Sequence, residues 1–402
     1  MDRRWLLVAA LVAAFNLRLA IAAPGPVIDT IRADTAMSSG LAGVLITIPF
    51  VCMSAFAFAG PPLIRRAAPY GVVLLSLSLI GAGTLARAVA PTPAFLIGAT
   101  VPIGIGIALM GVALPVVVKQ RFVHHSGAVT GAYVSALSAG VFVIGVGIVP
   151  LADLIGGWRP AFAISAAPAV VAIVMWFAVH SGIRAPSGSD RRPASSLAPP
   201  AGAFRPGRVE VLAAASFGLQ SMCYAGLVGW IAAIYIEVGW SPAAAALTTA
   251  SLGLFVIPGS LIVPSLSQGK DRRPWIAVTV AVMAVGVLGI AVAPGAAAPL
   301  WLAAFGLGGG AAFALQLALP IDLRSTALGV AHLTAWMLGL GYVLSAAAPI
   351  LVGVLRDVTG GFVVPMTLLG SLALLGIVVA FMLPPPLHRA PEPAAYPPVG
   401  PH

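Results

Sequence analysis

The sequence predicts an all-α membrane protein whose twelve transmembrane helices form two parallel six-helix bundles. Apolar residues make up 60% of its 402 residues and charged residues only 8%, whereas soluble domains contain about 45–50% apolar and about 25% charged residues. So few charges cannot cover a water-soluble protein of this size. The apolar stretches are continuous rather than alternating, which favours helices where bare backbone amides are too costly to expose. The two halves of the chain also share motifs.

Twelve apolar stretches are long enough to span about 30 Å of hydrocarbon. In the first half of the chain they lie at residues 5–28, 41–60, 71–90, 94–118, 127–150 and 160–180. In the second half they lie at residues 209–235, 243–265, 275–293, 300–319, 327–353 and 362–383. We therefore expect, in chain order, an N-terminal six-helix bundle, a cytoplasmic linker, a C-terminal six-helix bundle and a disordered cytoplasmic tail, at residues 1–180, 181–208, 209–385 and 386–402.

Basic residues in the connections predict the orientation, because cytoplasmic loops carry an excess of Lys and Arg. With a cytoplasmic N-terminus, 16 of the 21 basic residues fall on the cytoplasmic side: Arg3, Arg4, Arg65, Arg66, Lys119, Arg121, Arg184, Arg191, Arg192, Arg205, Arg208, Lys270, Arg272, Arg273, Arg324 and Arg389. Arg18 lies within a span, and the opposite side holds Arg32, Arg87, Arg159 and Arg356. We expect a multi-pass protein of the cell (plasma or inner) membrane with both termini cytoplasmic.

Three pairs of segments recur at similar offsets in the two halves. They are Leu151–Trp158 with Leu355–Phe362, Phe15–Arg18 with Phe217–Gln220, and Leu114-Pro115 with Leu319-Pro320, at offsets of 204, 202 and 205. The first pair shares the pattern Leu-x-Asp-x-x-Gly-Gly-aromatic. Six spans return the chain to its starting side, so the halves are predicted to be parallel repeats related by an axis along the membrane normal.

Several of these segments resemble one family of membrane proteins. Asn16-Leu17-Arg18, followed by Pro24-Gly25-Pro26 and Ile31-Arg32-Ala33-Asp34, is similar to the opening of the cyanate/nitroimidazole transporter family of the major facilitator superfamily. Phe217–Ser221 and Thr130–Tyr133 also match its pattern. The resemblance covers essentially the whole chain and implies transport of a small solute by alternating access. It does not name the substrate.

The loop between the second and third spans departs from the superfamily. That loop usually reads Gly-x-x-x-Asp-Arg-x-Gly-Arg, whereas Gly60–Arg66 keeps the glycine and the arginines but has no acidic residue. A gating salt bridge built on that aspartate is therefore not expected here.

Arg18 is the most informative residue for function. It lies 13 residues into the first span, roughly 20 Å along the helix axis, where an arginine costs at least about 2.5–3.5 kcal/mol on insertion scales. No Asp or Glu occupies the middle of any span. We expect the planar donor fork of Arg18 to bind an anionic or strongly polar group of the solute. The structural alternative is an arginine that caps carbonyls of a helix broken near Pro24 and Pro26.

Further candidate substrate-binding residues lie in the fifth, seventh and eleventh spans. Gln220 occupies the depth of Arg18 in the second half, and Tyr224 lies on the same helix face, four residues later. Helix-to-helix hydrogen bonding is an equally good explanation of Gln220. Tyr133 is a candidate lining residue. His332 and Trp336 are four apart, and since histidine titrates near neutral pH, His332 is a candidate for proton coupling or simply a hydrated side chain near the cytoplasmic face.

The favoured function is secondary transport of a small organic or inorganic anion, such as a cyanate-like solute, by a monomer in the lipid bilayer. The alternative is a proton-coupled exporter of small heteroaromatic compounds or drugs, with aromatic side chains as a stacking surface. A membrane receptor or sensor without transport is a third reading, which the two-fold repeat disfavours. Energy is expected to come from an ion gradient, with protons as one candidate coupling ion, or from the solute's own gradient.

Other classes of protein are disfavoured by the sequence. The net charge is +10, but the basic residues sit between apolar spans and not in runs interleaved with aromatics, so we expect no nucleic-acid partner. No Gly-x-x-x-x-Gly-Lys-Ser/Thr motif occurs. Cys52 and Cys223 lie in apolar segments and form no disulfide framework or metal-ligand spacing. We expect no enzymatic activity, no cofactor and no metal.

Overall fold

The structure, a computed structural model, describes residues 3–37, 39–122, 125–182 and 205–386. Within these ranges every regular element is a helix, which confirms the all-α prediction. Most of the predicted linker and nearly all of the predicted tail lie outside the described residues, so those boundaries stay a prediction.

The helices of the first half follow one another through short connections. They are α1 (Arg3–Ala22), the 3₁₀ turn η1 (Gly25–Val27), α2 (Ile28–Thr35), α3 (Ser39–Ala57), α4 (Gly60–Ala88), α5 (Pro93–Arg121), α6 (Ser126–Ile155), α7 (Trp158–Ser165) and α8 (Ala167–Gly182). The helices of the second half are α9 (Arg208–Glu237), α10 (Pro242–Leu266), α11 (Arg273–Val292), α12 (Ala298–Leu323), α13 (Ala327–Thr359) and α14 (Val363–Phe381).

A helix lies at each of the twelve predicted spans. Within the described residues, ten helical segments are long and apolar enough to cross a membrane, and two shorter apolar segments, Thr47–Ala57 and Ser251–Leu266, occupy the predicted second and eighth spans. The order of the predicted spans is therefore confirmed, and ten of the twelve are long and apolar enough to cross a membrane within the described residues.

Prolines account for three local differences from the predicted spans. The first span was expected to run to residue 28, but α1 ends at Ala22, and Pro24 and Pro26 lie in and beside the 3₁₀ turn that follows. The sixth span is divided into α7 and α8 just before Pro168. The segment after Gly60 is helical rather than a loop, and it kinks at Ala68, because a residue that precedes proline disfavours the α conformation.

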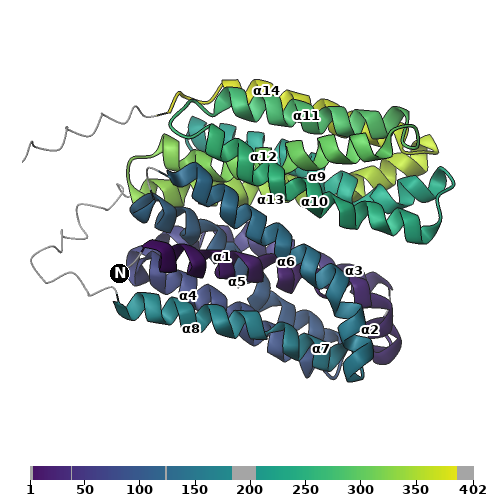
Figure 1. Cartoon of the computed structure of the whole chain (residues 1–402), viewed down its shortest axis with the longest axis horizontal. Helices are drawn as coiled ribbons and strands as arrows, with labels where there is room; N and C mark the ends of the chain where they lie inside the picture. Colours follow the sequence, from purple (N-terminus) through teal and green to yellow (C-terminus); the bar gives the residue numbers. More distant parts are fainter. Residues whose placement is uncertain (1–2, 38, 123–124, 183–204, 387–402) are drawn as a thin grey trace, which may run out of the picture.

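The two halves form two helical bundles that lie side by side, with the described N-terminal end of α1 at one end of the molecule (Figure 1). Between the halves, α6 packs against α10 and α12, while α13 packs against α3 and α5. We call the end where α1 and α9 begin the termini end and the opposite end the far end.

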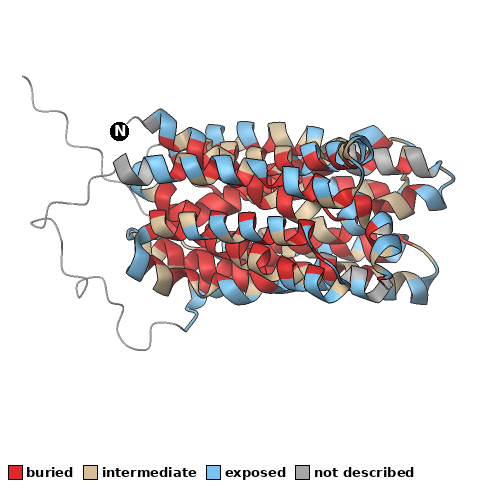
Figure 2. Ribbon diagram, turned by 90° about the horizontal axis from the view of Figure 1, so that it is seen from below, coloured by how far each residue is buried: buried red, intermediate tan, exposed pale blue. Residues whose placement is uncertain are grey.

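The outer surface of the molecule is apolar, as lipid contact requires. Figure 2 shows the buried residues filling the interior while exposed residues cover the outside. Many exposed side chains on the outer helices are hydrophobic, for example Val174, Phe177 and Val278, which are 63%, 60% and 62% exposed. Soluble monomers rarely expose apolar area on this scale. The chain is therefore a multi-pass membrane protein.

The repeated Leu-x-Asp-x-x-Gly-Gly-aromatic motif ends one long helix in each half. Gly156 terminates α6 with φ of 81°, and Gly360 terminates α13 with φ of 76°. Both backbone N–H groups donate to a carbonyl four residues earlier, in Ala152 and in Arg356. Glycine is required because the left-handed conformation is strained for other residues. The sequence repeat is thus a repeat of structure.

Candidate functional site

A cavity of about 560 Å³ lies between the two halves. Its walls come from α1, α3 and α6 of the first half and from α9, α10, α12 and α13 of the second. Along α1 the cavity extends from Arg18 to Ala22, which is the last residue of this helix and lies toward the far end of the molecule. Val141 and Ile350, which line it beyond the middle of their helices, are 43% and 69% exposed. The cavity therefore opens toward the far end.

Arg18 projects into this cavity from α1. Its guanidinium carbon lies 5.9 Å from the centroid of the Phe313 ring of α12, in a cation–π arrangement. Among the described residues no carboxylate pairs with it and no protein group accepts a hydrogen bond from it. The cation faces the cavity with its donors free.

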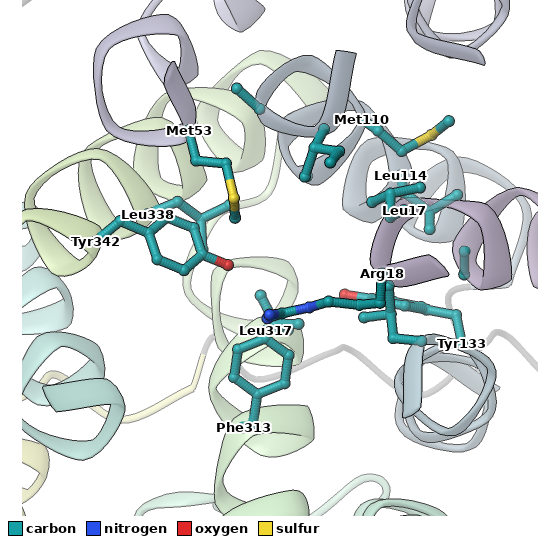
Figure 3. Close-up of a pocket in the computed structure, with 15 residues that line it drawn as sticks. Leu17, Arg18, Met53, Met110, Leu114, Tyr133, Phe313, Leu317, Leu338 and Tyr342 are labelled. Atoms are coloured by element: carbon teal, nitrogen blue, oxygen red, sulfur yellow. The ribbon is translucent and has the colours of Figure 1, made fainter. Parts of the chain in front are cut away.

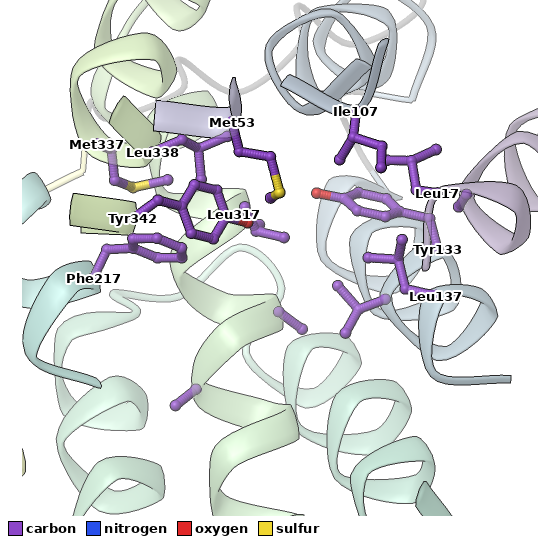
Figure 4. Close-up of a cluster of buried hydrophobic side chains, with 14 of the residues drawn as sticks. Leu17, Met53, Ile107, Tyr133, Leu137, Phe217, Leu317, Met337, Leu338 and Tyr342 are labelled. Carbon is purple, nitrogen blue, oxygen red and sulfur yellow. The ribbon is translucent and has the colours of Figure 1, made fainter. Parts of the chain in front are cut away.

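A second, smaller cavity of about 40 Å³ adjoins Arg18. Tyr133 of α6 and Tyr342 of α13 line it, and its remaining walls are mostly apolar and include Met53 and Leu338. The hydroxyl of Tyr342 and the guanidinium of Arg18 point toward each other (Figure 3). The hydroxyls of Tyr133 and Tyr342 point toward each other from opposite halves (Figure 4). The structure thus brings Tyr133 beside Arg18.

Gln220 and Tyr224 of α9 also line the large cavity. Gln220 is only 1% exposed; its carbonyl oxygen accepts from the Ser221 hydroxyl at 3.4 Å, and its amide nitrogen lies 3.8 Å from the Met283 sulfur. The packing explanation therefore fits Gln220 better than direct solute contact. The Tyr224 ring is stacked on Phe305, with centroids 5.3 Å apart, and forms part of the wall.

His332 and Trp336 line neither cavity. They lie in the first turns of α13, at the termini end, where the Trp336 indole N–H donates to His332 Nε2 at 3.2 Å. His332 Nδ1 lies 3.6 Å from Oε1 of Glu210, a carboxylate that also pairs with Arg324. Trp336 meets Phe58 of the first half edge to face, with centroids 4.8 Å apart. The pair lies in the closed part of the interface between the two halves, which we call the seam.

The termini end of the seam is closed by direct contacts. The Ser54 hydroxyl donates to the Gly339 carbonyl at 2.8 Å, and the Lys119 ammonium donates to the Ile321 carbonyl at 2.9 Å. The space beside Gly131 of α6 is taken by the Ser260 carbonyl of α10, 2.3 Å from where a Cβ would stand. Only glycine permits this approach, so the halves are held together tightly here.

Sequence reasoning missed two aromatic wall residues, Phe313 and Tyr342. Nothing in their local sequence distinguishes them from apolar helix neighbours. The repeat carried the missing signal: an offset of 204 relates Ser138 to Tyr342, and both line the large cavity. An offset of 205 relates Ala108 to Phe313, and both line the small one.

The described residues contain no group of His, Cys, Asp and Glu side chains that could hold a metal ion. Cys52 and Cys223 are free thiols, both buried.

A family model for the major facilitator superfamily matches residues 10–341, most of the chain. The chain belongs to the major facilitator superfamily. The resemblance found in the sequence is thereby confirmed, and this superfamily member is a secondary transporter with membrane-spanning helices.

Three curated relatives of this transporter span nearly its whole length. The cyanate transport protein CynX of Escherichia coli (strain K12) is 31% identical over 86% of this chain and 88% of its own. The 2-nitroimidazole transporter of the same organism is 32% identical over 93% of this chain and 94% of its own. The uncharacterized transporter YycB of Bacillus subtilis (strain 168) is 30% identical over 91% and 90%.

Two solved transporters share the fold. The proton:xylose symporter XylE, bound to 6-bromo-6-deoxy-D-glucose, superposes with a TM-score of 0.75 at 14% identity, covering 95% of this chain and 96% of that one. FucP in the outward conformation gives a TM-score of 0.72 at 11% identity, covering 94% and 99%. At these identities the likeness establishes the major facilitator fold alone. The relatives are named as transporters, and a small-molecule solute is the partner that they support.

Proposed function

We propose that this transporter carries a small anionic or strongly polar solute by alternating access, with Arg18 as its electrostatic anchor. The observation that carries the proposal is the Arg18 guanidinium, which faces the cavity without a carboxylate partner among the described residues. An unpaired cation within a membrane span is costly. A bound anion would supply the missing charge.

The names of the relatives support two candidate solutes. Cyanate, named for one relative, is a small anion and agrees with a cationic anchor. A heteroaromatic solute, as named for the other, is the second candidate, and the aromatic lining of the cavity favours it. In this second candidate the protein is an exporter, which collects its solute from the cytoplasm.

We place the transporter in the cell membrane with both termini in the cytoplasm, because the described basic connections gather at the termini end. The cavity then faces outward. During transport the contacts at the termini end would separate and the far end would close. We propose that a single chain is the transporting unit.

Protons remain our proposed coupling ion. The support is the cluster of Glu210, Arg324 and His332, which lies at the seam and reaches the first half through Trp336 and Phe58. No chemical transformation of the solute is proposed.

The proposal is tested by thermal unfolding of the purified transporter with cyanate, small carboxylates and nitroimidazoles. A ligand at 100 times its Kd raises the free energy of unfolding by about 2.7 kcal/mol, so an anion that binds should raise the unfolding temperature. Arg18→Lys should keep part of this shift and Arg18→Ala should lose it. Arg159→Ala serves as the matched control, since Arg159 lies outside the cavity and pairs with Asp34.

Two outcomes would go against the anion. If folded Arg18→Ala protein is stabilised by anions as strongly as the parent, Arg18 is not the anchor. If only neutral nitroimidazoles stabilise the parent and the variant alike, the heteroaromatic exporter replaces the anion transporter.

A further inference from the structure

Three hydrogen-bond donors without a protein partner among the described residues lie together beside the small cavity. Arg18, Tyr133 and Tyr342 all line the small cavity. None of the three makes a hydrogen bond to another group of the protein in the described part of the chain. Figures 3 and 4 show their polar ends converging, with the two hydroxyls approaching from opposite halves of the molecule. A guanidinium and two phenols form a donor set without an internal acceptor.

The serine side chains of the large cavity are already used within the protein. The Ser345 hydroxyl donates to the Ser221 carbonyl at 3.2 Å, and the Ser138 hydroxyl donates to the Val134 carbonyl at 3.1 Å. The Ser221 hydroxyl and the Gln220 amide are bonded to each other. The large cavity therefore offers a solute mainly apolar and aromatic surface away from Arg18.

The aromatic surface is held in place by buried rings behind it. Phe217, 0% exposed, contacts Phe313 at a centroid distance of 5.8 Å and Tyr342 edge to face at 5.5 Å. Phe305 supports Tyr224 in the same way. A wall of fixed rings loses little conformational freedom when a flat solute packs against it.

The volumes of the two cavities predict a solute with a small head group and a larger body. The small cavity, about 40 Å³, has room for a group of only a few atoms, since one water needs about 10–15 Å³ of such space. The large cavity, about 560 Å³, falls within the range of about 300–1,000 Å³ typical of small-molecule sites. A triatomic anion would leave most of it unfilled.

We propose that the solute is a single aromatic or heteroaromatic ring that carries a carboxylate, a planar two-oxygen group. The two-oxygen group enters the small cavity and accepts from Arg18, Tyr133 and Tyr342, while the ring lies in the large cavity against Phe313. This inference rests on the proposed role of Arg18 and adds the shape of the solute. Because Tyr133 and Tyr342 belong to opposite halves, the head group also joins the two bundles.

The test measures dissociation constants of matched probes by calorimetry on the purified full-length transporter. Benzoate, acetate and benzamide separate the ring from the charge, and 2-nitroimidazole with imidazole separates the nitro group from the ring. Benzoate should bind at least about tenfold more tightly than acetate or benzamide. The affinity for 2-nitroimidazole should exceed the affinity for imidazole by a similar factor if the nitro group binds at the same site.

Conservative variants locate the head group. Tyr133→Phe and Tyr342→Phe should each weaken benzoate about tenfold, because each removes one hydrogen bond to a charged group, and should leave imidazole unchanged. Phe313→Leu should weaken benzoate several-fold and leave acetate unchanged. Tyr235→Phe is the matched control, since its hydroxyl is buried elsewhere in α9 and lines neither cavity. Unfolding temperatures of all variants verify that they are folded.

The outcomes separate this inference from the proposed function. Equal affinity for acetate and benzoate, both dependent on Arg18, would overturn the aromatic solute and leave the anion anchor standing. Benzoate binding that survives both tyrosine variants would overturn the head-group site. Benzoate binding that is independent of Arg18 would overturn the proposed function as well.

Discussion

Two arginines lie deep in the first half, and their surroundings differ in one decisive respect. Arg87 of α4 is 1% exposed and donates to the Ala20 carbonyl at 2.7 Å and to the Thr100 hydroxyl at 2.9 Å. Arg18 of α1 faces a cavity, with the Phe313 ring beside it. The first guanidinium is used by the fold, and the second is left available.

The comparison resolves the structural alternative considered for Arg18. That alternative had Arg18 capping carbonyls where the first span breaks; the helix α1 ends at Ala22, and the Ala20 carbonyl there is capped by another guanidinium. The capping side chain is Arg87, which reaches across from α4. Because that task is taken by Arg87, the position of Arg18 is not explained by the helix end.

The largest predicted effect concerns Arg87. Arg87→Ala should lower the free energy of unfolding by about 3 kcal/mol, because it leaves a cavity and an unsatisfied carbonyl at Ala20. Thr100→Val should cost about 1 kcal/mol, since only one hydrogen bond is lost. Denaturation of the purified protein measures both. A loss of solute affinity at unchanged stability would reverse the roles of the two arginines.

The second prediction concerns Arg18. Arg18→Met should reduce solute uptake into proteoliposomes about 100-fold, which corresponds to about 2.7 kcal/mol and to the loss of about two charge-assisted hydrogen bonds. Its unfolding free energy should not fall below that of the parent, because an unpaired cation within a membrane span is itself costly. A strongly destabilised but active variant would contradict this assignment.

A third variant gives Arg18 the internal partner that it lacks. Phe313→Glu would place a carboxylate near the guanidinium and should weaken anion binding about tenfold, which corresponds to about 1.4 kcal/mol. Phe313→Gln is the control for the lost ring. Calorimetry with the best anion measures both, and equal affinities in the two variants would mean that the charge of Arg18 is not what anions recognise.

The smallest effect concerns a third arginine, Arg159, which is exposed and paired with Asp34 at the far end. The Arg159 side chain, and then the Trp158 indole N–H, hold the pKa of Asp34 below its usual value. This stabilisation is present above the unfolded-state pKa and is lost as the pH falls through the lowered folded-state pKa. Asp34→Asn should lower the unfolding temperature slightly near pH 6, and the difference from the parent should disappear once the pH falls below the lowered folded-state pKa of Asp34. A difference independent of pH would exclude the ion pair as its cause.

The sequence predicted the spans and their pairing because bilayer thickness dictates helix length, and the glycine motifs at Gly156 and Gly360 mark equivalent helix ends. It also predicted the depth of Arg18. It did not predict Arg87, which was counted with the far-side loops, because its position near the end of a span does not reveal that α4 turns it toward Ala20.

Which of the other predicted residues face the cavity depends on how each helix is rotated about its axis and on which end of the seam is closed. Gln220 has the depth of Arg18, yet its amide is directed to Ser221 and Met283. His332 and Trp336 lie on the correct helix, but the cavity begins further along α13, at Tyr342. Neither rotation nor conformational state can be read from apolar periodicity.

The closed end of the seam has a kinetic consequence. The Ser54 and Lys119 side chains reach backbone carbonyls of the opposite half, and water can replace such bonds as soon as the bundles part. The neutral Ser54 bond contributes about 0.5–1.5 kcal/mol net and the charged Lys119 bond about 1.5–3 kcal/mol, and a solute that favours one state by a similar amount is enough to shift the populations. We therefore expect the rate of turnover to depend on how fast water enters the termini end and replaces these two hydrogen bonds.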